Sequence, residues 1–192
     1  MKDIFLVLAS GSRYRAELLG RLGLPFEAWS PDVDESALPG EACADTALRL
    51  ARAKAEAARA RFPNTWIVGS DQVADLAGRA IGKPGHRDAA RAQLLDMRGR
   101  TVTFHTAVCL IAGAKVREAI VPTQVVFRPL SDEEIERYLD REPAFDCAGS
   151  AKSEGLGIAL LERLTGDDPT ALVGLPLVAL SAMLRAAGAS VP

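Results

Sequence analysis

Two long strand-like runs, joined by a short turn, constrain the fold more than any other feature of the sequence. They occupy residues 101–111 and 115–128, and only Ala112-Gly113-Ala114 separates them. Alternate positions of the first run share one face: Val102, Phe104, Thr106, Val108 and Leu110. This period of two is typical of strands, and two neighbouring strands of this length place a sheet at the centre of the fold.

The other patterns along the chain alternate between strands and helices. Further strands are expected at residues 4–9, 66–70 and 156–161, and a hairpin is expected at 73–81 around Ala77-Gly78. Helices are expected at 13–22, from a cap at Asp45 to 61, at 87–97, from a capping box at Ser131 to 141, and after Pro176. This mixed order predicts an α/β fold around a mixed sheet.

Composition limits the classes of function. The 192 residues are 48% hydrophobic and carry a formal net charge of -2, which is typical of one globular domain over residues 1–192. This charge gives no general reason to expect nucleic acid or an anionic membrane as a partner. The longest apolar stretches, such as 106–114, are too short to cross a bilayer, and residues 1–4 lack the apolar core of a signal peptide. Three widely separated cysteines favour reduced thiols and the cytoplasm.

Two short segments carry the clearest chemical signal, ASGSRYR at residues 9–15 and VGSDQV at residues 68–73. Each follows a strand-like run, at the point where a buried strand is expected to enter a loop. Gly and Ser let the backbone come close to a ligand, and the N–H groups of a following helix favour anions. Arg13 and Arg15 add positive charge, and Asp71 adds a carboxylate that can hold a metal or a water. Together the segments predict a site for a phosphorylated, metal-bound substrate.

Each candidate residue also has an ordinary structural interpretation. Arg15 fits a solvated first turn of a helix, and Lys54 fits the exposed face of a basic helix. Lys83 fits a turn, and Glu35 fits a solvated loop rich in acidic residues. Asp71 differs from these, because an unpaired carboxylate at the end of a buried strand is costly and therefore favours a functional role.

Other catalytic motifs do not occur in the sequence. It contains no phosphate-binding GxxxxGK[S/T] loop, no strand-linked GxGxxG and no GxSxG nucleophile elbow. Cys147 has no neighbouring histidine, which favours a buried filler over a nucleophile. With His86 and His105 as the two histidines of the chain, a histidine-rich metal site is not expected.

A family resemblance rests on ordered short segments along the chain. They are LASGS at 8–12, Arg15 with Leu18-Leu19, VDE at 33–35, ARAKA at 51–55, VGSD at 68–71 and GKP at 82–84. With these segments the sequence resembles the Maf family of nucleoside triphosphate pyrophosphatases over essentially its whole length. In the second half, FRPLS at 127–131, CAGS at 147–150, KSEG at 152–155 and DP at 168–169 with LVGLPL at 172–177 resemble the subgroup that hydrolyses 7-methyl-GTP.

Tyr14, Gln72 and Glu154 stand where the subgroup acting on dTTP and UTP has arginine, threonine and glutamine. The carboxylate of Glu154 can accept hydrogen bonds from the N–H groups of the guanine Watson–Crick edge, whereas it would repel a uracil carbonyl. Methylation at the 7 position makes the base cationic, so the face of Tyr14 is a favourable partner through cation–π attraction. The 7-methyl-GTP subgroup usually has tryptophan at this position.

The resemblance implies an elongated mixed sheet with flanking helices and two lobes around a central cleft. It also implies that the protein can form a homodimer. It implies that the protein hydrolyses the nucleotide 7-methyl-GTP to 7-methyl-GMP and pyrophosphate, with Mg²⁺ or Mn²⁺ as cofactor. This reaction would remove a modified nucleotide from the nucleotide pool and so sanitise it. The triphosphate-binding residues would be Ser10, Arg15, Lys54, Lys83 and Lys152. Glu35 and Asp71 would hold the metal, and Asp71 would also be the general base.

Three alternatives remain open at this point. One is a family member that acts on dTTP and UTP or on a broader set of triphosphates. The second is a cell-division regulator that binds nucleotide without turnover. The third is a nucleic-acid-binding protein that uses the basic helix at 49–61, although the net charge and the lack of interleaved aromatic residues argue against it.

Overall fold

A mixed seven-stranded sheet forms the centre of the computed structural model, which describes residues 4–191. The strands are β1 (Leu6–Ala9), β2 (Phe26–Ala28), β3 (Trp66–Leu76), β4 (Arg79–Ile81), β5 (Thr101–Ala112), β6 (Lys115–Phe127) and β7 (Leu161–Gly166). Their order is β2-β1-β3-β5-β6-β7, and β4 pairs with β3 outside this path. β1 runs parallel to β2 and β3, and the other pairs are antiparallel. The predicted α/β fold is confirmed.

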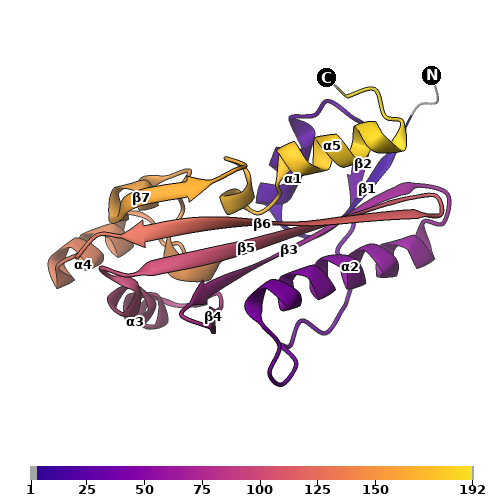
Figure 1. The fold of residues 1–192 in the computed structure, drawn as a ribbon. Coiled ribbons are helices and arrows are strands. Elements are labelled where there is room, and N and C mark those ends of the chain that lie inside the picture. The colour runs from indigo at the N-terminus through magenta and orange to yellow at the C-terminus, as the bar shows by residue number, and fades with distance from the viewer. Residues whose placement is uncertain (1–3, 192) are drawn as a thin grey trace.

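Helices pack on both faces of the sheet: α1 (Arg13–Gly20), α2 (Cys43–Arg61), α3 (Arg87–Met97), α4 (Asp132–Arg141) and α5 (Leu177–Ala187). Figure 1 shows α2 along one face and α1 with α5 on the opposite face near the same end, whereas α3 and α4 gather at the other end. The long strands β3, β5 and β6 join these two lobes, and the elongated two-lobed sheet agrees with what the family resemblance implies. Within residues 4–191, no helix is both long enough and apolar enough to cross a membrane.

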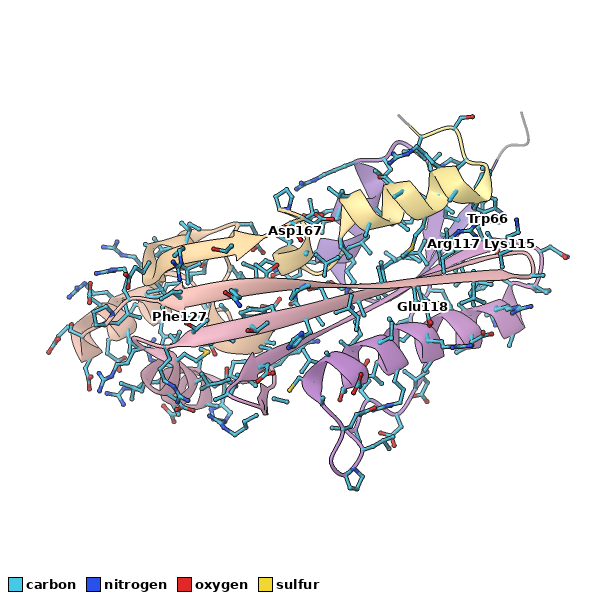
Figure 2. All side chains as sticks on the ribbon, in the orientation of Figure 1. Trp66, Lys115, Arg117, Glu118, Phe127 and Asp167 are labelled. Atoms are coloured by element: carbon cyan, nitrogen blue, oxygen red, sulfur yellow. The ribbon has the colours of Figure 1, made fainter. Side chains whose placement is uncertain are left out.

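Each lobe has its own buried apolar side chains. At the α3–α4 end, Phe127, labelled in Figure 2, packs with Met97 and Ile135. In the other lobe, one cluster lies between the sheet and the helices α1 and α5, and another lies between the sheet and α2. The site described below therefore lies on strands that are fixed by packing at both ends.

Gly69 lets α2 lie directly on β3. A Cβ at this position would overlap the carbonyl oxygen of Ala51 and lie 2.9 Å from the Cβ of Ala55, and both alanines are fully buried. Asp71 follows Gly69 by two residues and therefore projects from the same face of the strand. The close approach of the helix thus brings Lys54 of α2 within 2.6 Å of Asp71.

We expect Gly69→Ala to lower the free energy of unfolding by about 1–3 kcal/mol, because the added methyl group overpacks this contact. Urea denaturation measures the effect. Gly20→Ala is the control, since a Cβ there would lie at an ordinary 4.0 Å from Phe26 Cε1. Equal stability of the two variants would contradict the close-packing argument.

Local signals for several elements are confirmed. The hairpin at 73–81 corresponds to β3 and β4, and the long pair at 101–128 corresponds to β5 and β6. Ser131 and Glu134 form the predicted capping box at the start of α4. A helix follows Pro176 as expected.

Other boundaries were predicted incorrectly. β3 runs without interruption from Trp66 to Leu76, because it pairs with β5 along most of its length, so Asp71 lies inside a strand rather than at its end. The strand predicted at 156–161 is a 3-10 helix, Leu156–Leu160, and β7 begins only at Leu161. The α2 helix begins at Cys43 with Ala42 as its cap, so the predicted cap, Asp45, lies in the first turn instead.

Candidate active site

A cleft of about 800 Å³ opens beside the central strands. Its walls come from the start of α1, the inner face of α2, the middle of β3, the segment after β4 and the loop before α5. It brings together most of the predicted site residues: Ser10, Tyr14, Arg15, Glu35, Lys54, Asp71, Gln72 and Lys83. These residues are far apart in the sequence, so the fold itself assembles the site.

A narrower cavity adjoins this cleft and contains the remaining predicted residues, Lys152 and Glu154. Tyr14 and Gln72 line both spaces and therefore lie where the two spaces meet. The cavity has apolar walls that include Phe104, Phe127 and Leu172. Apolar walls with a few polar groups suit a flat base, and the charged cleft suits a triphosphate. Below, this narrower space is called the base cavity.

Lys54 joins the two carboxylates that were predicted to hold a metal. Its Nζ lies 2.6 Å from Asp71 Oδ1 and 2.6 Å from Glu35 Oε1. Lys54 is 6% exposed and Asp71 is 7% exposed, so the interpretation of Lys54 as an exposed residue on a basic helix is wrong. Burial of these charges is tolerated because each has an opposite charge at hydrogen-bond distance.

Glu35 is held in its ionised form by the surrounding cations. Partial burial raises the pKa of Glu35, but the hydrogen bond from Lys54 and the charges of Lys83 and Arg15 outweigh this effect and leave the pKa below its usual range. A carboxyl group whose pKa is lowered by folding stabilises the folded state above its unfolded pKa. That stabilisation is lost as the pH falls through the lowered pKa.

The donor set around Glu35 and Asp71 fits a hard divalent cation. Mg²⁺ in phosphate-binding sites is usually held by one or two carboxylates, with substrate oxygens and waters as the other ligands. Lys54 Nζ contacts Glu35 Oε1 and Asp71 Oδ1, so a bound cation would use the other oxygen of each carboxylate. Among residues 4–191, no group of three or more His, Cys, Asp or Glu side chains is arranged to hold a metal. Glu35 and Asp71 are the residues that would hold such a cation.

Arg15 is fixed at the cleft by the backbone and by Ser10. Its Nε donates to the carbonyl oxygen of Gly174 at 2.8 Å, and Nη1 donates to Ser10 Oγ at 3.2 Å. Burial lowers the pKa of the guanidinium, and the charges of Asp71 and Glu35 oppose this decrease. These two contacts hold the guanidinium at the wall of the cleft.

Two further cationic features face the cleft. Ser12 caps α1 and accepts a hydrogen bond from Arg15 N, so the positive end of this helix lies at the cleft wall. Lys83 follows β4, lines the cleft and is exposed, and its charge acts on Glu35. The structure thus brings Ser10, Arg15, Lys54 and Lys83 of the predicted triphosphate-binding set to one space, whereas Lys152 lines the adjoining base cavity.

Asp146 holds two of the predicted residues and was missed by the sequence analysis. It accepts from the Tyr14 hydroxyl at 3.1 Å and pairs with Lys152 Nζ at 3.0 Å. Partial burial raises the pKa of Asp146, but the hydrogen bonds from Lys152 and Tyr14 outweigh this effect and leave the pKa below its usual range. Its position directly before the CAGS segment at 147–150 was the signal that could have revealed it.

Gln72 is held by hydrogen-bond acceptors inside the protein. Its amide nitrogen donates to Thr106 Oγ1 at 2.8 Å and to the carbonyl oxygens of Ala171 and Leu172, both at 3.0 Å. Any contact between Gln72 and a base would therefore use its carbonyl oxygen. Glu154 is exposed at the wall of the base cavity.

Known proteins resemble this chain over nearly its full length. The family model described as Maf-like protein matches residues 5–187. A 7-methyl-GTP pyrophosphatase of Xanthomonas axonopodis pv. citri is 56% identical over 187 residues, which cover 97% of this chain and 98% of that protein. One of Aromatoleum aromaticum is 60% identical over 189 residues, which cover 97% of each.

Among solved structures, the Ham1 protein of Staphylococcus aureus is 14% identical, with a TM-score of 0.47 over 65% of this chain and 72% of that one. The family match covers residues 5–187, and the two relatives combine high sequence identity with almost complete coverage of both chains. The chain belongs to the Maf family.

Proposed function

We propose that this protein hydrolyses 7-methyl-GTP to 7-methyl-GMP and pyrophosphate, and so removes a methylated nucleotide from the nucleotide pool. One observation carries the proposal: a cleft with paired carboxylates and cations adjoins an apolar cavity edged by Tyr14 and Glu154. The names of relatives that are 56% and 60% identical support the same substrate.

In this proposal the triphosphate lies in the cleft. Arg15 and Lys83 bind its oxygens, and Ser10 with the first turn of α1 surrounds a phosphate. Negative charge builds up on the phosphate oxygens as the bond to the leaving pyrophosphate breaks. Fixed cations therefore lower the barrier by electrostatic stabilisation. Lys152 lies near Tyr14 and would bind where the base and the phosphates meet.

Asp71 is proposed as the general base. It takes a proton from a water whose oxygen bonds to the α-phosphorus. At the same time the bond from that phosphorus to the oxygen that bridges to the β-phosphate breaks, and pyrophosphate leaves with that oxygen. Lys54 donates to Oδ1 and so fixes the orientation of the carboxylate. Mg²⁺ or Mn²⁺, held by Glu35 and Asp71, would supply positive charge to the phosphate oxygens.

We also propose that the protein uses a divalent metal cofactor, forms a homodimer and is located in the cytoplasm. Pyrophosphate release with Mg²⁺, with Mn²⁺ and with a chelator tests the first, light scattering tests the second, and cell fractionation tests the third.

A substrate panel tests the proposed function. Pyrophosphate release from 7-methyl-GTP, GTP, UTP and dTTP should give the highest kcat/KM for 7-methyl-GTP. A preference for UTP or dTTP would favour the other subgroup of the family. Nucleotide binding without pyrophosphate release from any of the four would favour a regulator instead.

The base-recognition residues give a sharper prediction. Arg13 Cζ lies 4.8 Å from the Tyr14 ring centroid, so the ring already binds a cation. Tyr14→Ala should lower the preference for 7-methyl-GTP over GTP by about 0.5–2 kcal/mol, the usual range of a cation–π contact. Tyr14→Phe, which keeps the ring and loses the hydroxyl, is the matched control and should keep the preference.

Glu154→Gln should have a different effect on substrate preference. The amide carries donors where the carboxylate only accepts, so binding of both guanine substrates should weaken together. Values of kcat/KM for 7-methyl-GTP, GTP and UTP on each variant separate the two roles. An unchanged ratio of 7-methyl-GTP to GTP in Tyr14→Ala would exclude the stacking role.

A further inference from the structure

One loop, residues 168–178, supports the phosphate part of the site with its backbone. The carbonyl oxygen of Gly174 accepts from Arg15 Nε at 2.8 Å. Gly174 has a φ of +120°, which L-residues rarely adopt, and a Cβ there would lie 3.5 Å from Arg15 Nε. The orientation of the Arg15 guanidinium therefore depends on the path of this loop.

The same loop supports the base part of the site. The carbonyl oxygens of Ala171 and Leu172 accept from Gln72, and Ala171 also accepts from Thr106 Oγ1 at 2.9 Å. Gln72 lines both the cleft and the base cavity. A shift of the loop would thus move residues on both sides of the bound nucleotide.

Asp168 ties the two ends of this loop together. It is 3% exposed, and its Oδ1 accepts from Thr170 N at 2.9 Å and from Thr170 Oγ1 at 2.7 Å. Its Oδ2 accepts from Val178 N at 2.7 Å, across the loop. Thr170 Oγ1 in turn accepts from Leu177 N at 2.8 Å.

These contacts also complete the start of α5. Pro176 is the N-cap of this helix and makes no side-chain cap hydrogen bond, so Asp168 and Thr170 satisfy the first N–H groups instead. A buried carboxylate is stabilised by such N–H groups and by the positive end of the helix. Because Leu180 and Leu184 anchor α5 in the core, the far end of the loop is fixed.

We propose that Asp168 is a positioning residue for the reaction. It fixes the 168–178 loop, and through the carbonyl groups of that loop it orients Arg15 toward the triphosphate and Gln72 toward the base. The identity of the substrate rests on the proposed function, but the role of Asp168 in binding does not require turnover.

The experiment compares Asp168→Asn with Asp167→Asn. Asp167 is the exposed neighbour at the end of β7, labelled in Figure 2, and it loses the same charge. Calorimetry with a chelator measures the Kd and the number of sites for 7-methyl-GTP and for inorganic triphosphate, and kinetics gives kcat/KM for 7-methyl-GTP and UTP. Asp168→Asn should raise the Kd for both ligands about tenfold and lower kcat/KM by about 10–100-fold, because Arg15 and Gln72 would no longer be correctly placed. The selectivity between 7-methyl-GTP and UTP should also decrease. Asp167→Asn should stay within about twofold of the wild type.

A purely structural role predicts a different result. Loss of folded protein would reduce the number of binding sites and the Tm, while the Kd and the selectivity of the folded fraction stay unchanged, and this result would overturn the proposal. Thr170→Val, which removes the hydroxyl bound by Asp168, repeats the test with a smaller change if Asp168→Asn does not fold. Thr170→Ser should restore the wild-type Kd.

The two proposals can fail independently. Wild-type protein that releases no pyrophosphate from 7-methyl-GTP would contradict the proposed function alone. Wild-type Kd values for inorganic triphosphate and 7-methyl-GTP in Asp168→Asn and Thr170→Val would contradict the role of Asp168, whatever the wild type hydrolyses.

Discussion

Asp71→Asn should lower kcat by about 10²–10⁴-fold, the usual contribution of general acid–base catalysis, while the protein stays folded. The amide keeps the size of the side chain but removes the charge that, in the proposed mechanism, takes the proton and holds the metal. It also weakens the contact with Lys54, which lies 2.6 Å from Oδ1. Rates of pyrophosphate release from 7-methyl-GTP, with circular dichroism to confirm folding, measure the effect.

Asp75→Asn provides the matched control for this substitution. Asp75 lies on the same strand and the same face as Asp71, and its Oδ2 lies 3.4 Å from His105 Nε2. Its amide variant should keep kcat within about twofold of the wild type. If Asp71→Asn retains more than about a tenth of the wild-type kcat, Asp71 is not the base.

The elements that the sequence predicted correctly depend on local signals. The β5–β6 pair is defined by alternating residues and a short turn around Gly113, and α4 is defined by the capping box at Ser131. These interactions are made within a few residues or between adjacent strands. Their energies are therefore visible in a short window of sequence.

Long-range contacts explain the incorrect boundaries. Asp71 follows Gly and Ser, which suggested a loop, but pairing with β5 continues the strand through Asp75. In the 156–161 segment, Glu142 accepts from the N–H groups of Leu156 and Gly157 and folds the chain into a turn. Neither partner lies close enough in the sequence for a local pattern to reveal it.

The candidate site was likewise predictable from local motifs but not from long-range contacts. The charged residues were identified from motifs, and their types suited phosphate and metal. The burial of Lys54 was not predictable, because it depends on the absence of a side chain at Gly69 and the resulting approach of α2. Asp146 was not predictable either, because it contacts a residue that is distant in the sequence, Tyr14.

Lys54→Met should lower kcat/KM by about 10²–10³-fold, comparable to the loss of one preorganised electrostatic contact in other active sites. Methionine fills a similar volume but removes the charge that lies between Asp71 and Glu35. Arg52→Met is the control, because Arg52 lies on the same helix, is exposed and pairs with Glu118 at 3.7 Å. It should keep kcat/KM within about twofold of the wild type.

The pH dependence of Lys54→Met provides a second test. Lys54 makes the largest contribution that lowers the pKa of Glu35, so its loss should raise that pKa toward the usual range, and repulsion from Asp71 acts in the same direction. Glu35 would then take up a proton at a higher pH than in the wild type. In the proposed mechanism the ionised form of Glu35 would hold the metal, so the acidic limb of the kcat/KM profile should move to higher pH. An unmoved limb in Lys54→Met, or an equal shift in Arg52→Met, would show that Lys54 does not control the ionisation of Glu35.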